Sequence, residues 1–419
     1  MRKLISSITL VFLINLSAGA QRCAVGKINA KEYQEKKEQL QRLIDSHQND
    51  YNRNAKVQDE IIRIPVVVHV IHSTASGEIG GKSNVNITNQ QIYSQIRVLN
   101  EDYRKLFGTR GYNTNPVGAD MEMEFFLATK DPDGNPTSGI NRVYNVKKSY
   151  SIFTDLDLIA SKSYWDSSKY LNIWVTNLGD LYLGYGEFPG ANIEGLDARG
   201  APARRDGIFV DYRVFGSQTG TAVDGIYTYG RTLTHEIGHW FGLIHTWGDE
   251  YCGTDYCDDT PQIEESNSTE QCRIVYSQCN GITTKNMIEN YMDYSPDSCM
   301  HIFTQDQKER VRQVMNLSSR RKQLIANSDN IYQEINRVDF KVLNNPGDNQ
   351  SVAFQVLLPD IQDFNIQIYD FFGRVVFSQD YTNYASTVIS AADMDLLKGL
   401  YIVRFSSQNY ITTKRVVVL

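Results

Sequence analysis

Residues 235–245 read HEIGHWFGLIH and hold three of the seven histidines of the chain. His235 and His239 are four residues apart, so on a helix both imidazoles leave the same face and can bind one ion. Gly242 allows a sharp turn that brings His245 round as a third ligand. Three neutral imidazoles with one open position are typical of a catalytic zinc site, because structural zinc sites are closed and rich in cysteine.

Glu236 follows the first histidine and places a carboxylate beside the open position of the predicted metal. There it can act as the general base and acid of a hydrolysis. A structural metal site has no use for that carboxylate. The pattern therefore favours an enzyme over the alternative, a secreted metal-containing binding or adhesion protein without peptidase activity.

The complete motif resembles the signature of the metzincin zinc endopeptidases, and NYMDY at 290–294 resembles their downstream Met-turn. The resemblance implies that Met292 lies beneath the zinc site and that the Tyr294 hydroxyl stabilises the tetrahedral intermediate. It also implies an α/β (α+β) catalytic domain with a mixed five-stranded sheet and an active-site helix. More of the chain resembles one branch of the metzincins, the pappalysins. The matching stretches are residues 95–104, 171–175, 183–185 and 257–261.

Five of the six cysteines lie between residues 252 and 299, which is consistent with two disulfides in an exported protein. The resemblance implies the pairs Cys252–Cys279 and Cys272–Cys299. Cys257 is then unpaired, and a Cys257–Cys279 bond is the alternative pairing. In the chain-entropy model each loop of this size contributes about 3 to 4 kcal/mol.

Cys23 stands apart, in the sequence Arg22-Cys23-Ala24. The resemblance implies that its thiolate binds the zinc in a latent zymogen, as a cysteine switch. Ala24 departs from the glycine of the family pattern, and an incidental free thiol is the alternative.

Two further roles follow from the resemblance. Asp255, Asp258 and Thr260 are expected to bind structural calcium through oxygen atoms, the alternative being a solvated acidic turn. Asp297 is expected to face the residue after the scissile bond, where a carboxylate pairs with Arg or Lys and bidentate geometry favours Arg. The chain is thus predicted to be a secreted zinc-dependent endopeptidase that cleaves proteins before Arg or Lys.

Residues 1–20 have a basic start, an apolar stretch and a small-residue end, which is typical of a secretory signal peptide. We expect a propeptide at 21–54, the catalytic domain at 55–325 and a second domain at 336–419. Autolytic maturation is expected to cut before Arg53 or Lys56 and before Arg320.

Secondary structure was predicted for the best patterned segments. Buried strands are expected at 61–71, 122–129 and 171–177, and a helix at 88–106 with a capping box between Thr88 and Gln91. Residues 21–53 are polar and predict at most one loose helix.

The last 80 residues alternate polar and apolar side chains and predict a small all-β sandwich. Residues 368–370, 373–375, 397–403 and 414–419 resemble the sorting domain of type IX secretion. A carbohydrate-binding or adhesive sandwich is the alternative. The resemblance implies that the type IX machinery of a Gram-negative bacterium exports the protein to the cell surface or medium.

The chain has 42 basic and 49 acidic residues among 419, a formal net charge of −7. That balance and the lack of a basic tract argue against nucleic acid as a partner. After the leader we find no apolar run long enough for a transmembrane segment. The expected partners are protein or peptide substrates and the secretion machinery.

Overall fold

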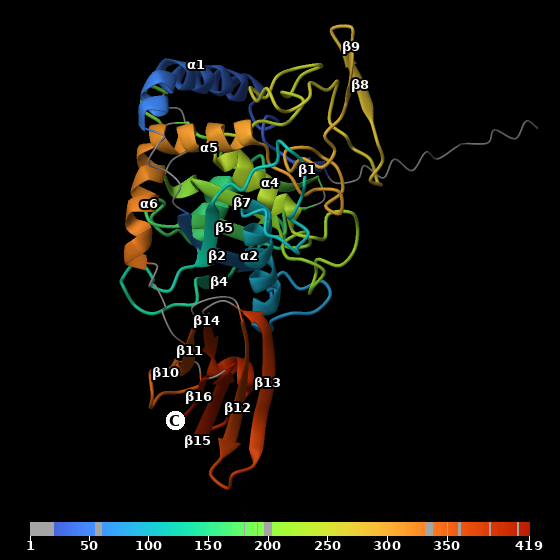
Figure 1. Cartoon of the computed structure of the whole chain (residues 1–419). Helices are drawn as coiled ribbons and strands as arrows, with labels where there is room; N and C mark the ends of the chain where they lie inside the picture. Colours follow the sequence, from blue (N-terminus) through green and yellow to red (C-terminus); the bar gives the residue numbers. More distant parts are fainter. Residues whose placement is uncertain are drawn as a thin grey trace, which may run out of the picture.

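A computed structural model describes residues 21–54, 61–179, 181–190, 192–196, 203–331, 338–349, 351–358, 362–384, 387–408 and 410–419. The predicted signal peptide and Lys56 lie outside these residues. In Figure 1 an N-terminal mixed α/β unit sits above a small unit made of strands. In the described part, no helix has the length and apolar character needed to cross a bilayer.

The central sheet of the first unit has seven strands in the order β1-β6-β7-β5-β2-β3, and β4 also pairs with β2. Its strands are β1 (Gln21–Cys23), β2 (Ile62–His72), β3 (Met123–Leu127), β4 (Ile140–Tyr144), β5 (Leu171–Thr176), β6 (Tyr182–Gly186) and β7 (Gly207–Asp211). β3 and β4 occupy successive stretches of the same edge of β2, and β1 comes from the predicted propeptide. Without β1 the mixed sheet is five strands wide, which confirms the predicted fold class.

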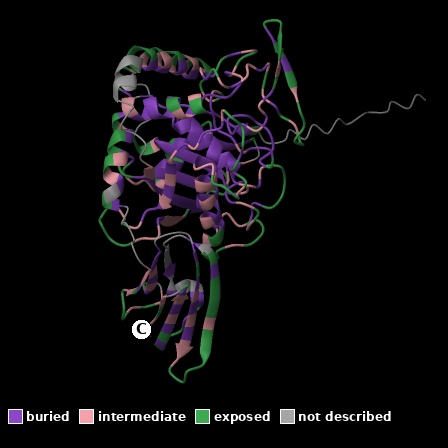
Figure 2. Ribbon diagram, viewed as in Figure 1, coloured by how far each residue is buried: buried purple, intermediate pink, exposed green. Residues whose placement is uncertain are grey.

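β6 is the one antiparallel neighbour of β7 in this sheet, and β1 pairs with β6 in parallel. The helices of the unit are α1 (Ala30–Asn54), α2 (Asn89–Tyr103), α3 (Leu156–Lys162), α4 (Arg231–Trp240), α5 (Gln305–Leu317) and α6 (Ser319–Ile331). A two-stranded hairpin, β8 (Tyr276–Cys279) and β9 (Ile282–Lys285), projects from the unit. Figure 2 shows that α4 and the central strands are almost entirely buried.

Two segments illustrate why the sequence folds this way. β2 is an inner, parallel strand whose two faces are both covered, with α6 packed against it, so its β-branched residues from Ile64 onward are buried. Thr88 caps α2 by accepting a hydrogen bond from the Gln91 amide. The Gln91 side chain does not complete the predicted capping box and instead donates to the carbonyls of Tyr212 and Phe215.

The polar 21–53 segment forms a helix of 25 residues, longer than the loose helix expected from its composition. Leu40 and Ile44 of α1 are buried in a cluster with Val314 of α5. In Figure 1, α1 lies alongside α5. A narrow apolar stripe on a charged helix is thus enough for docking.

The second unit consists of two antiparallel sheets, β10-β11-β14 and β13-β12-β15-β16, around a separate core. The strands are β10 (Asp339–Leu343), β11 (Ala353–Leu357), β12 (Gln362–Asp370), β13 (Val375–Tyr384), β14 (Thr387–Ser390), β15 (Gly399–Ser407) and β16 (Tyr410–Val418). Alternate apolar residues of β11, β12 and β15 point inward, as the sequence pattern predicts.

The predicted end of the first unit, residue 325, falls inside α6. This helix continues to Ile331, which is buried against Val67 and Tyr170, and Leu324 belongs to the main core. The Thr129 hydroxyl also donates to the Ile331 carbonyl oxygen at 3.0 Å. All of α6 therefore packs with the first unit.

Candidate metal centre

The three histidines of the 235–245 motif converge in the structure. His235 and His239 project from α4, and Gly242, with a φ of +87°, turns the chain so that His245 faces them. The Nε2 atom of His239 lies 3.1 Å from that of His235 and 3.0 Å from that of His245. Such an approach of three imidazole nitrogens is the geometry of ligands around one cation.

The other nitrogen of each ring has an acceptor. His235 Nδ1 lies 2.7 Å from the Tyr291 carbonyl oxygen, His239 Nδ1 lies 2.9 Å from that of Leu243, and His245 Nδ1 contacts Asp249 Oδ1. These acceptors fix the proton on Nδ1 and leave Nε2 with a lone pair, the tautomer that binds a metal. Burial and the neighbouring imidazoles lower the pKa of His239 well below its usual value, so this ring is neutral. The residues fit Zn²⁺.

Cys23 completes this group. Its Sγ atom and ligand atoms of the three histidines lie within 4.8 Å of one another, and all four residues are buried. Burial, followed by the nearby Glu236, raises the pKa of the thiol. A thiolate therefore forms here only with a cation at its side.

Glu236 contacts both Cys23 of β1 and the neighbouring strand β6. Its Oε2 atom is 3.4 Å from Cys23 Sγ and accepts a hydrogen bond of 2.8 Å from the Gly186 amide of β6. Oε1 has no partner among the described residues. Burial raises the pKa of this carboxyl to about 8. A Cβ atom on Gly184 would lie 2.7 Å from Oε1, so the carboxyl depends on a glycine in β6.

The 290–294 turn lies beneath and beside the histidines. A Cβ built on Gly238 of α4 would overlap Met292 Sδ, so the two residues are in direct contact below the motif. The Tyr294 ring centroid lies 5.0 Å from that of His245, and its hydroxyl donates to the Cys23 carbonyl oxygen at 3.3 Å. Met292 thus lies against α4 below the motif, and Tyr294 lies beside His245 and Cys23.

Asp297 is buried and ion-paired with Arg22, whose side chain is also fully buried. Asp297 Oδ2 accepts hydrogen bonds from the amides of Tyr229 and Arg231, which orient the carboxylate. Arg22 Nη1 donates to the Ser295 carbonyl oxygen at 2.8 Å. The residue before the predicted switch cysteine thus fills the pocket predicted for a substrate arginine.

Sequence reasoning missed the arginine in this pocket and two of its walls. The Arg22 guanidinium stacks 4.7 Å from the Tyr227 ring centroid, and Nη1 also contacts Met300 Sδ. It missed Asp249 as well, although an acid four residues after a histidine ligand on a tight turn is a recognisable signal for an orienting carboxylate.

The 255–260 loop brings only part of the predicted calcium set together. The Thr260 hydroxyl donates to Asp255 at 2.8 Å, and Asp255 is buried, whereas Asp258 is exposed and its amide donates to Asp306. Among the described residues, the one group of three or more His, Cys, Asp or Glu placed to hold a metal is that of Cys23. Calcium binding stays a prediction.

Both disulfides implied by the resemblance are present, Cys252–Cys279 and Cys272–Cys299, each with a sequence separation of 27. Cys257 is free and buried. The bonds tie the β8–β9 hairpin and the segment before it to the rest of the unit.

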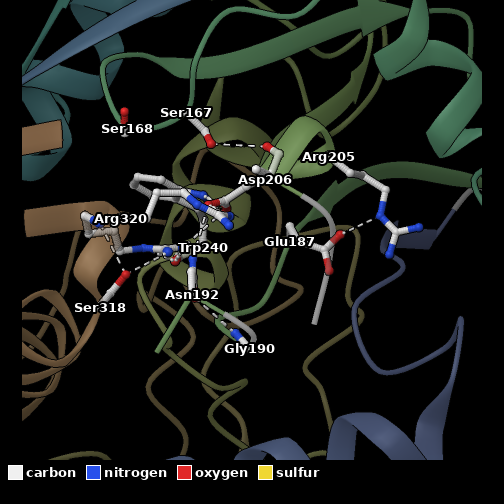
Figure 3. Close-up of polar contacts among 12 residues, drawn as sticks. Ser167, Ser168, Glu187, Gly190, Asn192, Arg205, Asp206, Trp240, Ser318 and Arg320 are labelled. Atoms are coloured by element: carbon white, nitrogen blue, oxygen red, sulfur yellow. Dashed lines mark hydrogen bonds and ion pairs between the residues drawn. The ribbon is translucent and has the colours of Figure 1, made fainter. Parts of the chain in front are cut away.

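A polar network behind α4 fixes α6 against the site (Figure 3). Asp206 accepts from Trp240 Nε1 at 2.7 Å and from Arg320 Nη1 at 2.6 Å. The Arg321 guanidinium stacks 4.0 Å from the Trp240 ring centroid. A cut before Arg320 would therefore have to open α6 and break this network.

Comparison with known proteins matches residues 155–316 to the model of a family described as pregnancy-associated plasma protein-A. The extracellular metalloprotease 1 of Coccidioides posadasii is 31% identical over 253 residues, which are 60% of this chain and 75% of that protein. The chain belongs to this family of metallopeptidases. Residues 344–419 match a secretion system C-terminal sorting domain.

Solved structures agree with the family assignment. Mature mirolysin from Tannerella forsythia, in complex with a cleaved peptide, is 34% identical with a TM-score of 0.57, covering 66% of this chain and 99% of that one. A promirolysin variant from Tannerella forsythia is 31% identical with a TM-score of 0.58, covering 74% and 96%.

As a member of this family, the protein is a secreted zinc metalloendopeptidase with a type IX sorting domain. The binding-protein alternative is set aside. So is a carbohydrate-binding sandwich, because the C-terminal unit matches the sorting domain.

Proposed function

We propose that the enzyme cleaves proteins on the N-terminal side of Arg, and less efficiently of Lys, and that it is made as a latent zymogen. One observation supports both parts. The N-terminal segment places Arg22 on Asp297 and Cys23 on the histidine cluster, so it occupies the side-chain pocket and the metal position together.

The preference for arginine follows from the shape of the pocket. The two terminal nitrogens of Arg22 have different acceptors, Asp297 for Nη2 and the Ser295 carbonyl oxygen for Nη1. The flat guanidinium also stacks on Tyr227. A lysine ammonium is a compact charge. It cannot donate to these two separate acceptors from a flat group that also stacks on the Tyr227 ring.

His235, His239 and His245 would hold the zinc, which supplies Lewis acidity to polarise the scissile carbonyl and activate water. Glu236 accepts the proton of the attacking water and passes it to the leaving amine, a role worth about 10² to 10⁴ in rate. The Gly186 amide holds the Glu236 carboxyl in position. Tyr294, which here donates to the Cys23 carbonyl, donates to the oxyanion that replaces it in the reaction.

Latency depends on the same contacts. Cys23 Sγ occupies the position that the attacking water needs, and Arg22 excludes the substrate side chain. Met292 and Gly242 keep the three histidines in place in either state. We place the regulatory segment at residues 21–54 and the peptidase unit after it, up to α6.

The specificity test uses quenched peptides that differ at the residue after the scissile bond: arginine, lysine, citrulline or norleucine. Citrulline has the shape of arginine without its charge. We expect kcat/KM for arginine to exceed that for citrulline by 10² or more, and Asp297→Asn to abolish the difference. Asp133→Asn, which changes an exposed carboxylate outside the proposed sites, serves as control. Equal cleavage of arginine and citrulline peptides would refute the preference.

The latency test compares secreted Cys23→Ala and Arg22→Ala with the unaltered zymogen. We expect both variants to cleave peptides at once, while the unaltered protein shows a lag that ends when residues 21–54 are lost. Glu236→Gln in the Cys23→Ala background should keep zinc, measured by metal analysis, and lose activity. An unaltered zymogen that is fully active before processing would contradict latency.

We also propose calcium as a structural ion of the 255–260 loop. A buried carboxyl supports this: burial raises the pKa of Asp255 to about 7, and a cation would relieve that cost. Added calcium should raise the melting temperature of the protein at pH 8 and leave that of Asp255→Asn unchanged. No shift in either protein would remove calcium from the cofactors.

A further inference from the structure

A pocket of about 390 Å³ lies where β6 begins, outside the groups described so far. Its walls are mostly apolar and include Tyr150, Phe153, Leu178, Leu181 and Tyr182. Phe153 and Leu181 are 42% and 55% exposed, so large apolar groups are left open to solvent here. Exposed apolar surface in a concave site is typical of ligand binding.

The charge in this pocket is already compensated. Asp155 also lines it, but its carboxylate accepts from Lys147 Nζ at 2.8 Å and from the Ser151 amide. The pocket therefore offers no unpaired charge to an ionic ligand, and its walls favour an apolar or aromatic group.

The direction of a bound substrate decides whether this pocket lies on its path. In a substrate, the scissile carbonyl belongs to the residue before the arginine that fills the Asp297 pocket. In the N-terminal segment, the residue at the histidine cluster is Cys23, which follows Arg22. A substrate with arginine in that pocket and its carbonyl at the cluster therefore runs opposite to β1. Since β1 is parallel to β6, the substrate is antiparallel to β6.

The substrate residue that follows the arginine consequently takes the position of Gln21. Gln21 pairs with Tyr182, and its amide donates to the Leu181 carbonyl oxygen at 2.9 Å. Both partners line the pocket. The second and third residues after the scissile bond therefore lie at the opening of this pocket.

Tyr150 adds a polar contact point. Its side chain is buried, and its hydroxyl has no hydrogen-bond partner among the described residues. A buried hydroxyl without a partner is unfavourable unless water or a ligand supplies one. A peptide carbonyl oxygen that enters the pocket would accept a hydrogen bond from this hydroxyl.

We propose that this pocket is a specificity subsite for an apolar or aromatic side chain at the second or third residue after the scissile bond. The inference rests on the proposed cleavage before arginine, because that arginine fixes the alignment of the chain. The enzyme then recognises arginine followed by a large apolar residue.

The experiment uses the processed, zinc-loaded enzyme and peptides with a fixed arginine and with Leu, Phe, Gly or Asp at each of the next two positions. We expect kcat/KM for Leu or Phe at one of these positions to exceed that for Gly or Asp by about ten-fold or more. Indifference at both positions, with cleavage still before arginine, would overturn the subsite and leave the proposed function intact. Cleavage away from arginine would overturn both.

Variants then locate the preference. Phe153→Ser and Leu181→Ser should reduce the preference for Leu or Phe over Gly to less than about three-fold. The control is Phe107→Ser, which changes a phenylalanine that is 79% exposed and lies away from the pocket. A preference that survives the Phe153 and Leu181 changes would place its origin elsewhere and refute this pocket. If these variants do not fold, the wild-type comparison alone still decides whether the preference exists.

Discussion

Tyr294 makes two different kinds of contact, one through its ring and one through its hydroxyl. Its ring packs at a steep angle against both His245 and Trp247, which stack on each other, and its hydroxyl donates to the Cys23 carbonyl oxygen. Removal of the hydroxyl leaves the ring packing intact. The effect of that change therefore reports on catalysis rather than on folding.

We predict that Tyr294→Phe lowers kcat about 10²-fold with little change in KM, because the donor acts on charge that develops in the transition state. Steady-state kinetics on the arginine peptide measure this. Tyr256→Phe, in the same apolar cluster, is the control. A loss confined to KM would show that Tyr294 only binds substrate.

Asp255 makes stability depend on pH. Burial raises its pKa to about 7 in the folded protein, above the ordinary value of 3.8. An acid with a raised folded pKa contributes stability that is fully present below its unfolded pKa and is lost as pH rises through the folded pKa. Without calcium, we therefore predict that wild-type protein loses stability between about pH 4 and 7, and that Asp255→Asn loses less. Thermal melts from pH 4 to 8 test this, and parallel curves would contradict it.

At the scale of elements, α1 does more than connect the regulatory strand to the peptidase unit. Lys37 is 2% exposed, donates to the Gly248 carbonyl oxygen at 2.7 Å and lies 3.5 Å from Asp249 Oδ2. The Tyr33 hydroxyl donates to the same carboxylate. The helix therefore docks on the residue that orients the third histidine.

We predict that Lys37→Ala shortens the latent period about ten-fold, because a buried ion pair and a hydrogen bond between α1 and the peptidase unit are lost. The time course of activity after purification measures this. Lys31→Ala is the matched control, since the Lys31 side chain is 90% exposed on the same helix. Equal latent periods would show that α1 is dispensable for latency.

The sequence predicted elements well where one local signal was strong. The continuous apolar run of β2 and the capped, periodic α2 are such cases. β4, β6 and β7 have five residues each and were not predicted. β3 is as short, but the Pro-Asp-Gly-Asn-Pro turn at 132–136 that follows it helped to mark it as a strand. At the site, the spacing of the histidines indicated their convergence, whereas the pairing of Arg22 with Asp297 joins residues 275 apart and needs the fold.

At the scale of the whole molecule, α6 decides where the peptidase unit ends. It packs on the core through Leu324 and Ile331, and Arg320 and Arg321 bind the network behind α4. The sequence placed the end at residue 325 because the composition changes there. Composition does not reveal which side of a junction a helix packs on.

We predict that a chain ending at residue 338 keeps full peptidase activity, whereas one ending at residue 325 melts at least about 5 °C lower, since half of α6 and its buried contacts are lost. Differential scanning calorimetry with activity assays compares the two. Equal melting temperatures would place α6 outside the cooperative unit.

The parallel pairing of β1 with β6 has a pharmacological consequence. Under the proposed function, a short peptide with the order Gln-Arg-Cys-Ala would bind in the direction opposite to that of a substrate. It would fill the Asp297 pocket and bring sulfur to the zinc, and its peptide bonds would not have the orientation that hydrolysis requires. Such a peptide is a starting point for the design of an inhibitor that the peptidase does not cleave.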